Sequence, residues 1–141
     1  MTVLRTIEEL ESELDELAER YPDVVGVIDA LLDELAADDD LLDVLFSEVP
    51  KWHYLFKPPF EIKRFEACWQ SGRSVYILKP YDEDGHLIDF RLFLGHDIRT
   101  DECFVLTVQH RSTCYDTTTP AYRNLCVRYD QLDIPAVRRN S

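Results

Sequence analysis

The segment 110–115 carries the residue types best suited to chemistry in this chain. It begins with His110 and Arg111, ends with Tyr115, and follows directly on an apolar run rich in β-branched residues. Arginine offers a planar, permanently charged fork that matches a phosphate, and tyrosine offers a phenol that donates or relays a proton. A buried strand that ends in these side chains therefore predicts a site for phosphate chemistry, with His110 as an alternative proton carrier.

Length and composition limit the classes of protein to consider. The chain has 141 residues, 45% of them hydrophobic and 11% aromatic, which predicts one globular domain with a real core. No apolar run approaches the roughly 18 residues of a membrane span, and the acidic start lacks a signal-peptide pattern, so we expect a cytoplasmic protein. Four cysteines lie far apart in the sequence, which favours reduced, buried thiols, and no metal or cofactor is expected.

The net charge of −13 is distributed very unevenly. Residues 1–48 contain 16 acidic and two basic residues, a charge of −14, whereas the remaining residues carry a charge of +1. An acidic surface repels nucleic acid, so any RNA contact must come from the part of the chain after residue 48. The acidic residues form either a solvated helical face or a surface that shields a basic site or mimics a polyanion.

The N-terminal part predicts helices. Thr6 reads as the N-cap of a helix over roughly 7–20, with Glu9 completing a capping box. Pro22 suits the first turn of a second helix, whose apolar residues recur at helical spacing. The acidic run 38–40 then interrupts the pattern and is a candidate cap for a short third helix.

Beyond a connector at 49–60 that is rich in proline and aromatic residues, the apolar period becomes that of strands. Four antiparallel strands are expected, at Phe60–Trp69, Val75–Lys79, Leu87–Leu94 and Phe104–His110. The run 82–85, which ends in Asp-Gly, predicts a hairpin turn between the second and third strands. Residues 117–141 predict a short helix near 121–128 and a polar tail. The expected fold is a single α+β domain, 1–141, with N-terminal helices packed on a four-stranded antiparallel sheet that spans 60–116.

Short motifs in the sheet region resemble the RelE/ParE toxin superfamily of type II toxin–antitoxin pairs. The central strand of that family often begins with a Tyr-Arg-like pair, and the matching run here is 89–93, which contains Arg91. The family's last strand passes through a basic step to a tyrosine, which matches His110, Arg111 and Tyr115. Lys79 lies on the matching preceding strand. The resemblance covers roughly 60–116.

The resemblance implies a toxin with a cognate antitoxin as partner, and an endoribonuclease, if active, that cuts mRNA at the ribosome without a metal. The ribose 2′-hydroxyl would attack the adjacent phosphate, which requires a base, an acid and cations for the developing charge. Arg91 and Arg111 would hold the phosphate, and Lys79 would add charge or act as a base. Tyr115 would orient the substrate or transfer a proton, as would His110. Oligomeric state is left open.

The charge of this chain departs from the resemblance, since ribosome-dependent toxins are normally basic throughout. The alternative is a non-catalytic module of the same fold that binds a basic protein through its acidic helices. In that case Arg91 and Arg111 would be paired internally with carboxylates such as Asp89. A toxin would instead bring its arginines together on a positive surface, with the acidic helices on the opposite side. Strand alternation places Arg91 and Arg111 on faces that permit a shared site.

Overall fold

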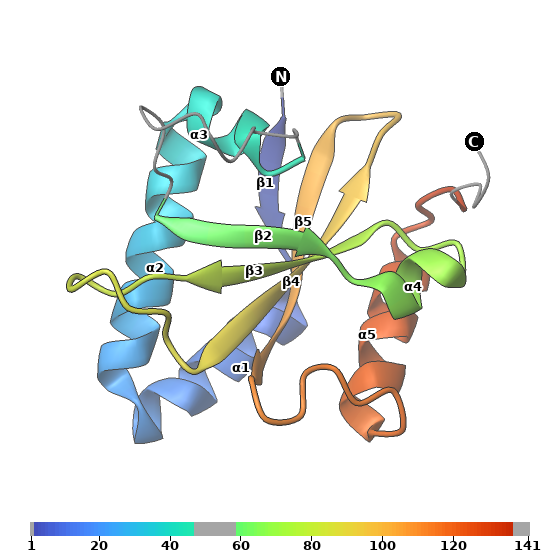
Figure 1. The fold of residues 1–141 in the computed structure, drawn as a ribbon. Helices are drawn as coiled ribbons and strands as arrows, with labels where there is room; N and C mark the ends of the chain where they lie inside the picture. Colours follow the sequence, from blue (N-terminus) through green and yellow to red (C-terminus); the bar gives the residue numbers. More distant parts are fainter. Residues whose placement is uncertain (1, 47–58, 137–141) are drawn as a thin grey trace.

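The computed structural model describes residues 2–46 and 59–136, so nearly all of the predicted connector at 49–60 lies outside the described residues (Figure 1). The elements follow in the order β1 (Val3–Thr6), α1 (Glu8–Arg20), α2 (Pro22–Ala37), α3 (Asp39–Val44), β2 (Phe60–Arg64), α4 (Glu66–Gln70), β3 (Val75–Pro80), β4 (Phe90–Asp97), β5 (Glu102–His110) and α5 (Pro120–Gln131). None of the described helices is long and apolar enough to cross a membrane.

The described strands form one open sheet in the order β1-β5-β4-β3-β2 (Figure 1). Strands β2 to β5 pair antiparallel, and β1 pairs parallel with β5. The predicted α+β class is therefore confirmed, but the sheet is mixed and has a fifth strand that the sequence analysis missed. The turn before β4 is confirmed, with Gly85 at a φ of 80° that favours glycine.

The start of the chain differs from the prediction. Thr6 is the last residue of β1, and Ile7 is the N-cap of α1 without a side-chain cap. The predicted capping box between Thr6 and Glu9 is therefore wrong, and the Thr6 hydroxyl donates to Glu11 instead. The capping role of the 38–40 run is confirmed, since Asp38 accepts a hydrogen bond from the amide of Leu41 at 3.1 Å.

The predicted strand Phe60–Trp69 is only half correct. Strand β2 ends at Arg64, and the chain then turns through Phe65 into α4, where Cys68 is fully buried. The indole of Trp69 donates to the carbonyl of Val75 and so holds this helix against the start of β3. Helix α4 is too short for its periodicity to be distinguished from strand alternation.

Helices cover the sheet on both faces (Figure 1). On one face, α1, α2 and α3 bury a large cluster with the strands, including Leu10, Ile28 and Leu92. On the other, α4 and α5 bury a smaller cluster that includes Phe93 and Tyr129. The acidic helices α1 and α2 and the C-terminal helix α5 thus belong to opposite layers.

Helix α5 runs from Pro120 to Gln131 and so extends beyond the predicted 121–128. Thr119 is its N-cap, and the Thr119 hydroxyl accepts a hydrogen bond from the amide of Tyr122. The predicted reduced cysteines are confirmed as four free thiols. Three are buried and one, Cys126, is partly buried.

Candidate functional site

Three of the five predicted site residues lie on the α5-facing side of the sheet. By alternation Arg91 shares the face of Phe93, which packs with α5, and its strand partner on β5 is Gln109. Arg111 lies just beyond the end of β5, where it pairs with Asp89. Lys79 shares the face of Ile77 on β3. Tyr115 lies in the loop after β5, and its ring is 6.4 Å from the ring of Phe65, a member of the same cluster.

His110 lies on the other face. It pairs with Phe90 across β4 and β5, and its ring packs at 5.1 Å against the Phe90 ring, which belongs to the α1–α2 face. Its Nδ1 lies 2.8 Å from the hydroxyl of Ser112. The structure therefore does not bring His110 together with Arg91.

Arg91 is buried, and no carboxylate of the described residues is paired with it. Only 7% of its surface is exposed, and its Nη1 donates to the carbonyl oxygens of Ile88 and Phe90. Its Nε is buried and has no hydrogen-bond partner among the described residues. Because a buried guanidinium costs free energy unless its charge is balanced, this arrangement favours an anion-binding role for Arg91 over packing alone.

The charges of Lys63, Lys79 and Arg91 all act on the Cys114 thiol. Burial raises the pKa of Cys114, while the positive charges of Arg91, Lys63 and Lys79 act in the opposite direction. Lys63 reaches this position because it pairs with Ile77 across β2 and β3 and therefore faces the α5 side. Three strands thus each contribute a cation to one part of the face.

Tyr115 stands at the edge of this cluster. It is 44% exposed, and the Nζ of Lys63 lies 4.5 Å from the centre of its ring. The phenol therefore has access to solvent, while the ring is held between a cation and the edge of Phe65.

Hydrogen bonds within the loop after β5 fix the position of Tyr115. Asp116 accepts from both the amide and the hydroxyl of Thr118, which lowers the pKa of the Asp116 carboxyl. The hydroxyl of Thr119 donates to the carbonyl of Asp116 and also caps α5. The Cys114 thiol donates to the carbonyl of Arg111 at 3.5 Å.

Two carboxylates partly balance these cations. Asp89 is paired with Arg111 and not with Arg91, with 3.2 Å between Oδ1 and Nε, and both side chains are more than half exposed. Glu61 lies 4.0 Å from the Nζ of Lys79 and accepts from the hydroxyl of Tyr81 at 2.9 Å. Because these pairs are exposed or long, they hold the cations weakly.

Sequence reasoning gave no role to Lys63, Cys114 or Gln109. The side-chain amide nitrogen of Gln109 is buried without a partner among the described residues, beside Arg91 on the neighbouring strand. The register of the strands would have identified Lys63 and Gln109, because each lies on the same face of the sheet as a predicted site residue, Lys79 or Arg91. Cys114 gave no signal, since a turn and not a strand places it.

One further group has the composition of a metal site. The ligand atoms of Asp82, Asp84 and His86 all lie within 4.8 Å of one another in the β3–β4 turn. Asp82 already accepts hydrogen bonds from the amides of Asp84 and His86, which accounts for the cluster as a turn.

Comparisons with protein-family models, with curated proteins and with solved structures found no match for this chain. What the arrangement can do therefore rests on its geometry. It brings cations and an accessible phenol to one face of the sheet, and a phosphodiester is a ligand that fits this set.

Proposed function

We propose that this protein is a RelE/ParE-like toxin whose α5-facing surface binds an RNA phosphate and cleaves the chain without a metal. The observation that carries the proposal is the placement of Lys63, Lys79 and Arg91 on three neighbouring strands of one face, with Tyr115 against Lys63. A cognate antitoxin and ribosome-bound mRNA are the partners that the family resemblance implies.

The burial of Arg91 supports this function over that of a non-catalytic module. The module requires both arginines to be paired with carboxylates, and Arg111 meets this condition through Asp89. Arg91 does not, because its described partners are backbone carbonyl oxygens and its Nε is left free. A guanidinium held in this way is preorganised for an anion.

The distribution of charge gives a second line of support. The acidic helices α1 and α2 pack on one face of the sheet (Figure 1). Strand register puts Lys63 and Arg91 on the other face, with Ile77 and Phe93. Phosphates approaching the α5 side would meet mostly cations, so the net charge of −13 does not by itself oppose RNA binding at this site.

The proposed reaction is a transesterification. The ribose 2′-oxygen forms a bond to phosphorus, the bond from phosphorus to the 5′-oxygen breaks, and the products are a 2′,3′-cyclic phosphate and a free 5′-hydroxyl. Arg91 and Lys63 stabilise the charge on the phosphate oxygens. A water molecule accepts the 2′ proton, Lys79 adds positive charge beside the phosphate, and the Tyr115 phenol donates a proton to the departing 5′-oxygen.

The experiment is controlled expression in a bacterial host, scored for growth and for mRNA cleavage. Wild type is compared with Lys63→Gln, Lys79→Gln and Tyr115→Phe, all of which change partly or fully accessible side chains. We expect growth arrest by wild type and a loss of cleavage of about 100-fold or more in each variant, as when other charge-stabilising groups are removed.

Arg20→Gln is the matched control, since it removes one positive charge from α1 on the other face. It should leave cleavage unchanged. Normal growth on expression of folded wild-type protein would contradict the proposed function.

A further inference from the structure

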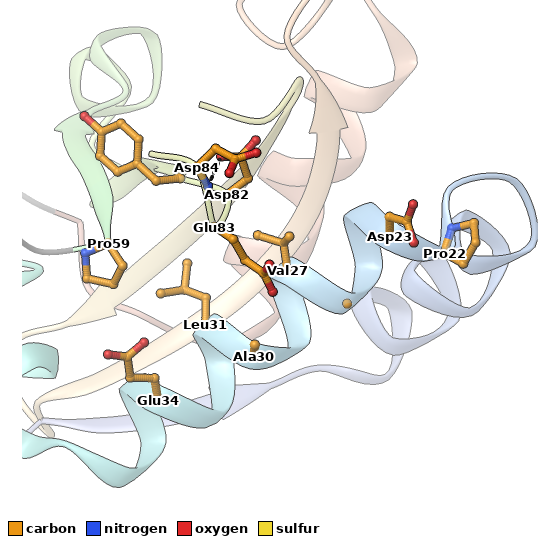
Figure 2. A pocket seen from close by; sticks show the side chains of 12 residues that line it. Pro22, Asp23, Val27, Ala30, Leu31, Glu34, Pro59, Asp82, Glu83 and Asp84 are labelled. Carbon is orange, nitrogen blue, oxygen red and sulfur yellow. Dashed lines mark hydrogen bonds between the residues drawn. The ribbon is translucent and has the colours of Figure 1, made fainter. Parts of the chain in front are cut away.

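A groove runs along α2 on the side of the molecule away from the candidate site. It has a volume of about 860 Å³ and lies between α2 and the turn that joins β3 to β4 (Figure 2). Its lining positions on α2 extend from Pro22 to Glu34 along one helical face. At 1.5 Å per residue this is about 18 Å, the length of three helical turns.

The floor of the groove is apolar and open. Val27, Ala30 and Leu31 of α2 form it, with Pro59 at one end (Figure 2). Gly26 lies in the same floor, and a Cβ added there would have nothing within 4 Å. Glycine inside a helix costs about 1 kcal/mol relative to alanine. Gly26 therefore lowers the stability of α2 but leaves the groove wider at this position.

The rim of the groove is acidic. Its charged lining residues are all carboxylates, contributed by α2 and by the turn, namely Asp23, Glu34, Asp82, Glu83 and Asp84. None of them forms an ion pair with another residue of the described part of the chain. Figure 2 shows the carboxylates of the turn across the groove from Val27 and Leu31.

We propose that this groove binds a basic amphipathic helix of a partner protein. The apolar floor would take the partner's aliphatic side chains, and the rim of unpaired carboxylates would take its lysines and arginines. The like charge of the rim excludes nucleic acid as the occupant. The inference does not depend on the proposed function, since the groove and the cationic cluster share no lining residue.

The test uses the full chain and a fluorescein-labelled helical peptide of about 14 residues, with leucines at positions i, i+3, i+4 and i+7 and lysines elsewhere. Fluorescence anisotropy measures its Kd. A scrambled peptide of the same composition is the control for nonspecific attraction to an acidic protein. We expect the amphipathic peptide to bind at least about tenfold more tightly than the scrambled one.

Two matched pairs of substitutions locate the binding. Glu83→Lys with Asp84→Lys reverses charge at the rim, and Glu16→Lys with Glu19→Lys makes the same change on exposed α1 positions outside the groove. The rim pair should weaken binding by about tenfold or more, and the α1 pair by much less.

Gly26→Gln tests the floor without changing charge. The longer side chain would occupy the groove, and its higher helix propensity keeps α2 folded. It should weaken binding several-fold while the thermal midpoint of unfolding stays the same or rises. Equal losses from the rim and α1 pairs, equal affinity for the two peptides, or no binding to the full chain would each overturn the proposal.

Discussion

At the scale of single residues, the contacts of Arg91 favour a functional role for this side chain over a structural one. A buried guanidinium that supports the fold is normally paired with a carboxylate, because an unpaired buried charge is expensive. Arg91 instead has two backbone carbonyl partners and a free Nε. Groups that lower stability in this way are typical of binding sites.

Arg91→Met is therefore expected to separate stability from activity. Methionine fills a similar volume and leaves no unpaired charge, so the free energy of unfolding in urea should fall by no more than about 1 kcal/mol. RNA cleavage should fall by about 100-fold or more. A loss of several kcal/mol, with activity retained in the folded fraction, would make Arg91 a structural residue.

At the scale of elements, the outer edge of β5 is closed by an ion pair from two helices. Beyond the β1 pairing, Glu13 of α1 accepts hydrogen bonds from the hydroxyl of Thr107 and the amide of Val108. Its other oxygen lies 2.9 Å from Nη1 of Arg128 on α5, which also donates to the carbonyl of Leu106. This pair joins the layers on the two faces of the sheet.

Glu13→Gln should lower the free energy of unfolding by about 1–3 kcal/mol, because it weakens charged hydrogen bonds to a strand edge. Arg128→Met should have a similar effect, and the double variant should cost less than the two single losses together. Urea unfolding measures all three. Glu16→Gln, an exposed change on the same helix, should stay within about 0.5 kcal/mol of wild type. Strictly additive losses would show that the two side chains act independently.

The same elements show how far sequence reasoning reaches. Helices α1 and α2 and the three strands from β3 to β5 followed from apolar periodicity, which is strong over long segments. Strand β1 was missed because its four residues carry too short a pattern, and α4 because its apolar residues alternate. The pairing of Glu13 with Arg128 had no signal at all, since two charged positions on different helices meet only through the tertiary fold.

The candidate site shows the same limit. Strand alternation predicted that Arg91 and Arg111 could share a site, the residue types at 110–115 added Tyr115, and the resemblance alone added Lys79. His110 went to the other face because it is the direct partner of Phe90. Whether a residue at a strand end faces one layer or the other depends on the local turn, and composition does not determine that turn.

At the scale of the whole molecule, charge is divided between the faces of the sheet. On the acidic face, burial raises the pKa of Asp29, and the like charges of Asp33 and Asp15 raise it further. On other parts of the surface the hydrogen bonds of Arg99 lower the pKa of Asp97, and those of Arg73 lower the pKa of Asp130. The two groups of carboxylates therefore respond to pH in opposite directions.

The direction in which Asp29 changes the folding stability with pH follows from the linkage between protonation and folding. Because its pKa is higher in the folded state than in the unfolded state, its charge destabilises the fold at neutral pH, and this penalty disappears as the pH falls through the folded pKa. Asp97 and Asp130 stabilise the fold at neutral pH, and their contribution is lost as the pH falls below about 4. Stability should therefore be greatest on the acidic side of neutrality, above the pH range in which Asp97 and Asp130 lose their charge.

The substitution Asp29→Asn tests the destabilising charge of Asp29 by itself. Since Asp29 and Asp33 are four residues apart on α2, the variant should be more stable than wild type by a few tenths of a kcal/mol at pH 7. The difference should be smaller at about pH 5 than at pH 7, because protonation of the Asp29 carboxyl begins at a higher pH in the folded state. It should also shrink in about 1 M salt, which screens the repulsion. Urea unfolding at the two pH values measures it. An Asp29→Asn variant less stable than wild type at pH 7 would mean that the acidic face is held together by contacts of Asp29 and not strained by its charge.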